Sequence, residues 1–249
     1  MRNRGTAEPE QRRLDKMFLK RFRPKGVAHE SATLGRITEE DLRTRSSSGT
    51  AVVDVRPGMQ FAKGHFPGSL NVGFANRTFA ACVALFLPKQ SEILLVVDKP
   101  DDASRALAEL ASAGFDKVVG YTEASDLTVL HQITQLSVFD LNSTLSRGGK
   151  PEILDVRTFG EWKSSGICGS RNIPLAQLAP RVLELSSFDP LVVVCQDGYQ
   201  SAVASSWLQA NGFDSIQQLL GGIDAYTGSP FKEGAESFSF SPLQSGSAF

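Results

Sequence analysis

A repeated set of short motifs constrains the fold of this chain more than any other feature of its sequence. Four blocks recur in the same order: residues 51–56 with 152–157, 64–72 with 165–173, 93–97 with 191–195, and 114–116 with 212–214. Four ordered matches are not expected between unrelated segments. Because the chain has 249 residues, the repeat predicts two tandem domains of about 100 residues each.

Each copy alternates apolar strand patterns with helical patterns. In each copy a strand ends in Asp-Val-Arg, a glycine-rich loop and a short strand with an asparagine follow, and another apolar strand comes after a helix. Thr38 and Ser137 are suitable N-caps for the first helix of each copy. Such alternation predicts an α/β fold, in which each domain is a parallel sheet of about five strands flanked by helices. The final strands are expected at residues 117–119 and 217–220.

The predicted organisation has four parts. They are a basic, poorly ordered extension (1–34), a first domain (35–128), a second domain (129–230) and a flexible tail (231–249). Residues 1–25 hold nine Lys or Arg against three acidic residues. This segment could be an arm for nucleic acid or a membrane surface, or an organelle-targeting peptide, but a solvated extension is the favoured interpretation.

Cys195 is the candidate nucleophile. It follows the apolar run 191–194, precedes a short polar loop with one glycine, and stands just before a predicted helix over 201–210. Backbone N–H groups at a helix N-terminus favour a thiolate, so a low thiol pKa is expected. In the first copy the equivalent position is Val97 or Asp98, and the loop there holds Pro100. The first domain is therefore expected to be inactive and to act as a scaffold or docking surface.

Other classes of protein are disfavoured by composition. The net charge of −1 gives no reason to expect nucleic-acid binding, and no apolar run is long enough to span a membrane. Three cysteines make a disulfide framework unexpected, and three scattered histidines show no zinc-ligand spacing. We therefore predict a cytoplasmic protein with no cofactor, no metal, no membrane partner and no nucleic-acid partner.

Four motifs together resemble the rhodanese family of sulfurtransferases. They are residues 155–157, residues 169–174, the Cys195 loop and residues 221–226. More narrowly, the chain is similar to the double-rhodanese part of proteins that fuse a metallo-β-lactamase-like domain to two rhodanese domains. That resemblance implies a metallo-β-lactamase-like or sulfide-oxidising protein as a partner.

The resemblance implies that Cys195 carries sulfane sulfur as a persulfide. The donor would be thiosulfate or a low-molecular-weight or protein persulfide, and a thiol would be the acceptor. Substrate would be bound by the loop residues Gln196, Asp197, Gly198, Tyr199, Gln200 and Ser201. Asp155, Arg157 and Arg171 would support this loop. For Arg157 a structural salt bridge, for instance with Glu161, is the favoured alternative, and Arg171 could face either the site or solvent.

Several positions depart from the family pattern. Gln200 stands where many members have arginine, Asp197 adds negative charge, and Gly166 replaces a histidine. Cys168 replaces a proline and is either a plain substitution or a resolving thiol. Weak activity towards thiosulfate is therefore expected, with persulfide donors at least as suitable.

Two other functions compete with the sulfurtransferase. One is a non-catalytic rhodanese-like interaction or regulatory module. The other is a cysteine phosphatase, which is disfavoured because Ser201 stands where the phosphate-clamping arginine would be.

Overall fold

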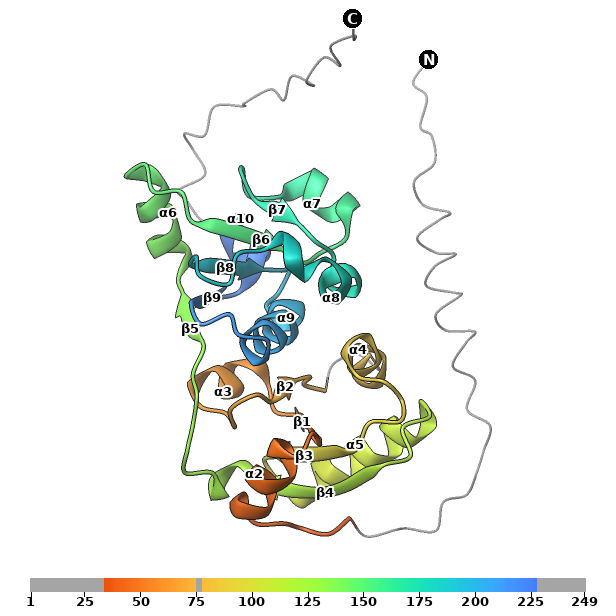
Figure 1. Ribbon diagram of the computed structural model, residues 1–249. Coiled ribbons are helices and arrows are strands. Elements are labelled where there is room, and N and C mark those ends of the chain that lie inside the picture. The colour runs from red at the N-terminus through yellow and green to blue at the C-terminus, as the bar shows by residue number, and fades with distance from the viewer. Residues whose placement is uncertain (1–33, 75–77, 228–249) are drawn as a thin grey trace, which may run out of the picture.

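The computed structural model describes residues 34–74 and 78–227, and it confirms two tandem α/β units (Figure 1). The predicted basic extension and tail lie almost wholly outside these residues. Within the described part, no helix has both the length and the apolar character needed to cross a bilayer.

The first unit is a four-stranded parallel sheet in the order β2-β1-β3-β4. Its elements are α2 (Glu39–Ser47), β1 (Ala51–Asp54), α3 (Gly58–Lys63), β2 (Leu70–Asn71), α4 (Phe79–Phe86), β3 (Ile93–Val97), α5 (Pro100–Ser112), β4 (Val118–Glu123) and the 3₁₀ turn η1 (Ala124–Asp126). Strand β3 is buried along its whole length, as its continuous apolar run predicts.

The second unit is a five-stranded parallel sheet in the order β5-β9-β8-β6-β7. Its elements are β5 (Thr134–Leu136), α6 (Val138–Ser146), β6 (Glu152–Asp155), α7 (Phe159–Ser165), β7 (Arg171–Asn172), η2 (Leu175–Gln177), α8 (Leu178–Arg181), η3 (Val182–Glu184), β8 (Leu191–Val194), α9 (Tyr199–Ala210), β9 (Ile216–Leu219) and α10 (Gly222–Thr227). The edge strand β5 was not predicted.

The repeat is visible in individual hydrogen bonds. In the first unit the Asn71 amide donates to the carbonyls of Asp54 and Arg56, at 3.0 and 2.9 Å. In the second unit Asn172 donates in the same way to Asp155 and Arg157, at 2.9 and 2.8 Å. The shared asparagine thus ties each short strand to the turn that follows the Asp-Val-Arg strand.

Local capping follows the sequence. The side chain of Thr38 accepts from the backbone N–H of Asp41, and that of Ser137 accepts from the N–H of Asp140, so both predicted N-caps are confirmed. The helix expected from Ser201 begins two residues earlier, at Tyr199, because the loop after Cys195 is shorter than predicted.

Helix α9 lies between the two sheets and packs against both units (Figure 1). The Ser206 hydroxyl accepts from the backbone N–H of Asn71 at 2.8 Å, and Gln209 pairs with His65 at 2.8 Å. At Gly58 a Cβ atom would lie 2.6 Å from the Cβ of Ala202, so α3 approaches α9 too closely for a side chain. One apolar core therefore runs through both units.

Candidate active site

Cys195 lies directly after β8, at the carboxyl end of the sheet, where ligands of parallel α/β folds bind. The backbone N–H of Gly198 donates to its sulfur at 3.1 Å, and the thiol donates to the Ser201 hydroxyl at 3.4 Å. Gly198 has a φ of 103°, a left-handed conformation that favours glycine, and this curls the loop around the sulfur.

The Cys195 side chain has no exposed surface, which the sequence did not predict. Burial raises the pKa of its thiol, although hydrogen bonds from Ser201 and from the loop backbone act in the opposite direction. The expectation of a low thiol pKa is therefore wrong, because desolvation outweighs the helix N-terminus. In this structure the sulfur of Cys195 is therefore closed off from solvent.

This raised pKa predicts a steep pH dependence. Because the thiol form dominates at neutral pH, the alkylation rate of Cys195 should rise about tenfold per pH unit from about pH 7 to about pH 9. Peptide-resolved mass spectrometry after timed iodoacetamide exposure measures this rate. A rate that is flat above about pH 7 would show that the thiolate already dominates there.

Asp197 occupies a backbone N–H donor that an anionic ligand could use. Its Oδ1 accepts from the backbone N–H of Tyr199 at 2.9 Å and lies 3.8 Å from the Cys195 sulfur. The carboxylate thus stands beside the sulfur at the first turn of α9. Weak binding of anionic donors stays a prediction.

Arg157 forms a buried structural salt bridge, as the favoured interpretation expects, but its partner is Asp155 and not Glu161, and it also joins a network that orders the loop. It pairs with Asp155 at 2.7 Å and donates to the side-chain oxygen of Gln196 at 2.8 Å. Glu161 instead completes a capping box with Thr158 at the start of α7. The amide nitrogen of Gln196 also donates to Asp224, so the first loop residue is held from two elements.

Arg171 does not join this network. It lies on β7, about half exposed, and contacts Glu152 at 3.3 Å and the carbonyl of Glu184 at 2.8 Å. Gln200 is the second residue of α9 and is half-buried. Cys168 is exposed, whereas Cys82 and Cys195 are buried. None of these three cysteines forms a disulfide.

Two elements outside the predicted loop, β9 and α10, complete the site. The buried Gln218 of β9 donates to the carbonyl of Gly198 at 2.8 Å and to the Ser201 hydroxyl at 3.0 Å. Helix α10 donates from the N–H of Ile223 to the carbonyl of Cys195 at 2.8 Å. The consecutive glutamines 217 and 218 in an otherwise apolar strand were the signal in the sequence for this contact.

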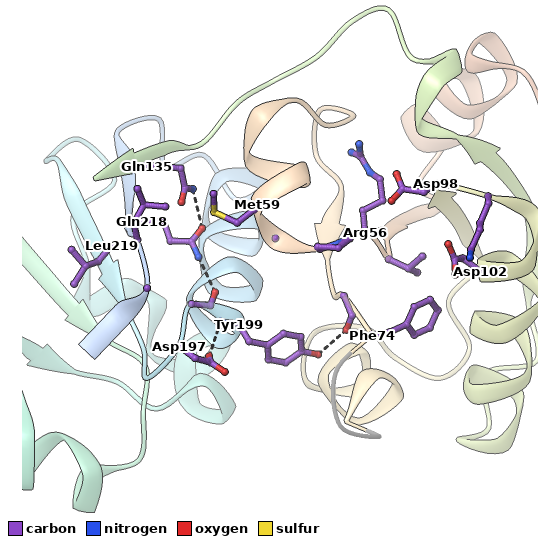
Figure 2. Close-up of a pocket in the computed structure, with 18 residues that line it drawn as sticks. Arg56, Met59, Phe74, Asp98, Asp102, Gln135, Asp197, Tyr199, Gln218 and Leu219 are labelled. Atoms are coloured by element: carbon purple, nitrogen blue, oxygen red, sulfur yellow. Dashed lines mark hydrogen bonds between the residues drawn. The ribbon is translucent and has the colours of Figure 1, made fainter. Parts of the chain in front are cut away.

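A cavity of about 920 Å³ lies between the units beside the Cys195 loop (Figure 2). Asp197, Gly198 and Tyr199 line it from the second unit, and Phe74 and Lys99 line it from the first. The Tyr199 hydroxyl donates to the carbonyl of Gly73 at 3.0 Å, and burial raises its pKa, so it remains protonated.

The first unit has no thiol at the matching place. Asp54 pairs with Val96 as Asp155 pairs with Val194, so the residue that corresponds to Cys195 is Val97. Val97 is fully buried, and α5 begins at Pro100, which leaves a loop of two residues. In the part of the chain that the structure describes, no group of His, Cys, Asp or Glu is placed to hold a metal ion.

Comparisons with known proteins agree on one family. A model of the rhodanese-like domain matches residues 38–125 and 140–229. The uncharacterized protein YqhL of Bacillus subtilis is 37% identical over 79 residues, 32% of this chain and 63% of that protein. The adenylyltransferase and sulfurtransferase MOCS3 of Arabidopsis thaliana is 31% identical over 119 residues, 41% of this chain and 26% of that protein.

Two further matches carry the word sulfurtransferase in their names. The thiosulfate sulfurtransferase GlpE of Shewanella oneidensis is 33% identical over 75 residues, 30% of this chain and 74% of that protein. The crystal structure of a thiosulfate sulfurtransferase from Pseudomonas aeruginosa is 21% identical, with a TM-score of 0.35, and the match covers 78% of this chain and 42% of that chain.

Proposed function

The chain belongs to the rhodanese-like domain family, and on that premise we propose that it is a sulfurtransferase that carries sulfane sulfur as a persulfide on Cys195. The position of the Cys195 sulfur carries this proposal. It lies at the carboxyl end of β8, where the N–H of Gly198 donates to it and the hydroxyl oxygen of Ser201 accepts from the thiol. These groups stabilise a thiolate or a persulfide anion once it forms.

The transfer takes place in two balanced steps. The Cys195 thiolate attacks the outer sulfur of a sulfane donor, an S–S bond forms on Cys195, and the leaving group departs with the electron pair of the broken bond. An acceptor thiolate then attacks the outer sulfur of this persulfide. The acceptor leaves as a new persulfide, and Cys195 regains its thiolate.

The charges around the loop favour a persulfide donor over thiosulfate. Three carboxylates, Asp98, Asp102 and Asp197, line the cavity between the units. The two cations that line it are Lys99 and Arg56, and Arg56 is already paired with Asp54. Asp197 also takes the backbone N–H of Tyr199. A dianion such as thiosulfate is repelled there, whereas a low-molecular-weight or protein persulfide presents less charge at the reacting sulfur.

Treatment of the full-length chain with sulfur donors, followed by peptide-resolved mass spectrometry, tests the proposal. After exposure to glutathione persulfide or polysulfide, the peptide with Cys195 should gain the mass of one sulfur atom, and less of it should gain this mass with thiosulfate. Cys195→Ser should abolish the gain on this peptide. Cys168→Ser, the matched control at an exposed thiol, should leave the mass gain on the Cys195 peptide unchanged.

The complete burial of Cys195 favours a second candidate, a non-catalytic interaction or regulatory module. The same experiment separates the two functions. If no donor adds sulfur to Cys195, the sulfurtransferase is excluded and the module remains. The sulfurtransferase proposal includes a relation to proteins that fuse a metallo-β-lactamase-like domain to two rhodanese domains. It also includes a partner protein as the sulfur source, either a metallo-β-lactamase-like protein or a sulfide-oxidising protein.

A further inference from the structure

The side chain of Gln218 is held in one orientation by its neighbours. Its nitrogen faces the carbonyl of Gly198, which can only accept a hydrogen bond, and its oxygen accepts from the amide of Gln135 at 3.2 Å. A flipped amide would lose both bonds. The nitrogen therefore presents its N–H groups to Gly198 and to the hydroxyl of Ser201 (Figure 2 draws the bond between the two glutamines).

Ser201 has three polar neighbours and one proton to give. Its oxygen accepts from Gln218 at 3.0 Å and from the Cys195 thiol at 3.4 Å, while its own proton goes to the carbonyl of Gly198 at 3.1 Å. When Cys195 loses its proton, the sulfur stops donating and becomes a strong acceptor. The Ser201 hydroxyl then makes its strongest hydrogen bond when it turns its proton towards the sulfur and donates to it.

Such a turn of the hydroxyl withdraws one of three donors from the half-buried carbonyl of Gly198. The other two donors are the side chain of Gln218 at 2.8 Å and the backbone N–H of Ala202 at 3.2 Å, and together they fill both lone pairs of that carbonyl. Because Gln218 fills the lone pair that Ala202 leaves open, the proton of Ser201 can leave Gly198 without leaving that lone pair unfilled.

We propose that Gln218 is a positioning residue that frees the Ser201 hydroxyl to stabilise the anionic sulfur of Cys195. The inference rests on the proposed function, because it concerns the thiolate and persulfide states of the same site. Gln218 does not bond to the sulfur itself and acts through Ser201. The charged groups on or against the loop are Asp197, which lies 3.8 Å from the sulfur, and Arg157 and Asp224, which contact Gln196.

The test measures the alkylation rate of Cys195 against pH in the full-length chain. Gln218→Met keeps the length of the side chain but removes both N–H groups. The apparent pKa of Cys195 should rise by about one unit, and the rate near pH 8 should fall about tenfold, because a hydrogen bond to a charged group is lost. Gln217→Leu, on the same strand but on the opposite face, is the matched control and should leave the profile unchanged.

A double-mutant cycle separates positioning from a general structural role. Ser201→Ala should raise the pKa of Cys195, and Gln218→Met should add nothing further in that background. If the two shifts add, or if Gln218→Met leaves the profile unchanged, the inference is overturned. Should Gln218→Met lose the native circular dichroism, Gln218→Asn keeps the amide but is too short to reach both partners, and the same pKa rise is expected. Alkylation requires no sulfur donor, so these results stand apart from the outcome of the persulfide test.

Discussion

Arg157→Met is expected to lower the free energy of unfolding by about 3–5 kcal/mol, because it leaves a buried carboxylate without its partner. The Arg157 side chain is 1% exposed, and its partner Asp155 is 0% exposed. Without the guanidinium, Asp155 keeps one local bond, from the backbone N–H of residue 157 at 3.0 Å. Urea denaturation followed by circular dichroism measures the loss.

The first unit offers a matched control for this substitution. Arg56 pairs with Asp54 at 2.6 Å in the corresponding place and is nearly as buried. Arg56→Met should cost a similar free energy, but it does not touch Gln196. A change in the pH profile of Cys195 alkylation is therefore expected in Arg157→Met alone. Equal stability of Arg157→Met and the parent chain would contradict the assigned role of the buried pair.

Gly222→Ala is expected to lower the free energy of unfolding by about 2–5 kcal/mol and to slow sulfur loading of Cys195 more than tenfold. Gly222 has a φ of 59° at the start of α10. A Cβ atom there would overlap the carbonyl oxygen of Cys195 and lie 2.6 Å from that of Gln196. The helix must then move away from the loop and lose its two backbone bonds to these carbonyls.

Gly212→Ala separates backbone strain from this clash. Gly212 has a φ of 86°, but a Cβ atom there would meet nothing within 4 Å. Gly212→Ala should lower the free energy of unfolding by only about 1–2 kcal/mol, which is the strain of an alanine in the left-handed conformation. Sulfur loading of Cys195 should be unaffected. If the two variants lose the same stability and keep the same loading, the contact between α10 and the loop is not important for either property.

The features that the sequence predicted depend on neighbouring residues. The N-caps, the buried strands and the position of Cys195 after β8 each follow from a short pattern, and the repeat doubled the support for each. The capping box of Thr158 and Glu161 was equally readable, and it would have excluded Glu161 as the partner of Arg157.

The features that were missed depend on pairs far apart in the chain. The pKa of Cys195 is raised by burial, since α10 and β9 close around the loop from positions more than 20 residues away. Gln218 meets Gly198 only because β9 lies beside β8. The edge strand β5 pairs with β9 across most of the second unit, and its three residues, of which only Leu136 is apolar, carried little local signal.

The packing of α9 against both sheets means that the two units meet as the protomers of a dimer would. The segment between η1 and β5 joins them covalently, but the shared core and the bonds from Ser206 and Gln209 to the first unit hold them together. The connecting segment then mainly sets a high effective concentration of one unit for the other. A chain cut in this segment should behave as two fragments that reassociate, and the first unit, which has no cysteine at the place of Cys195, would serve as the obligate subunit of the other.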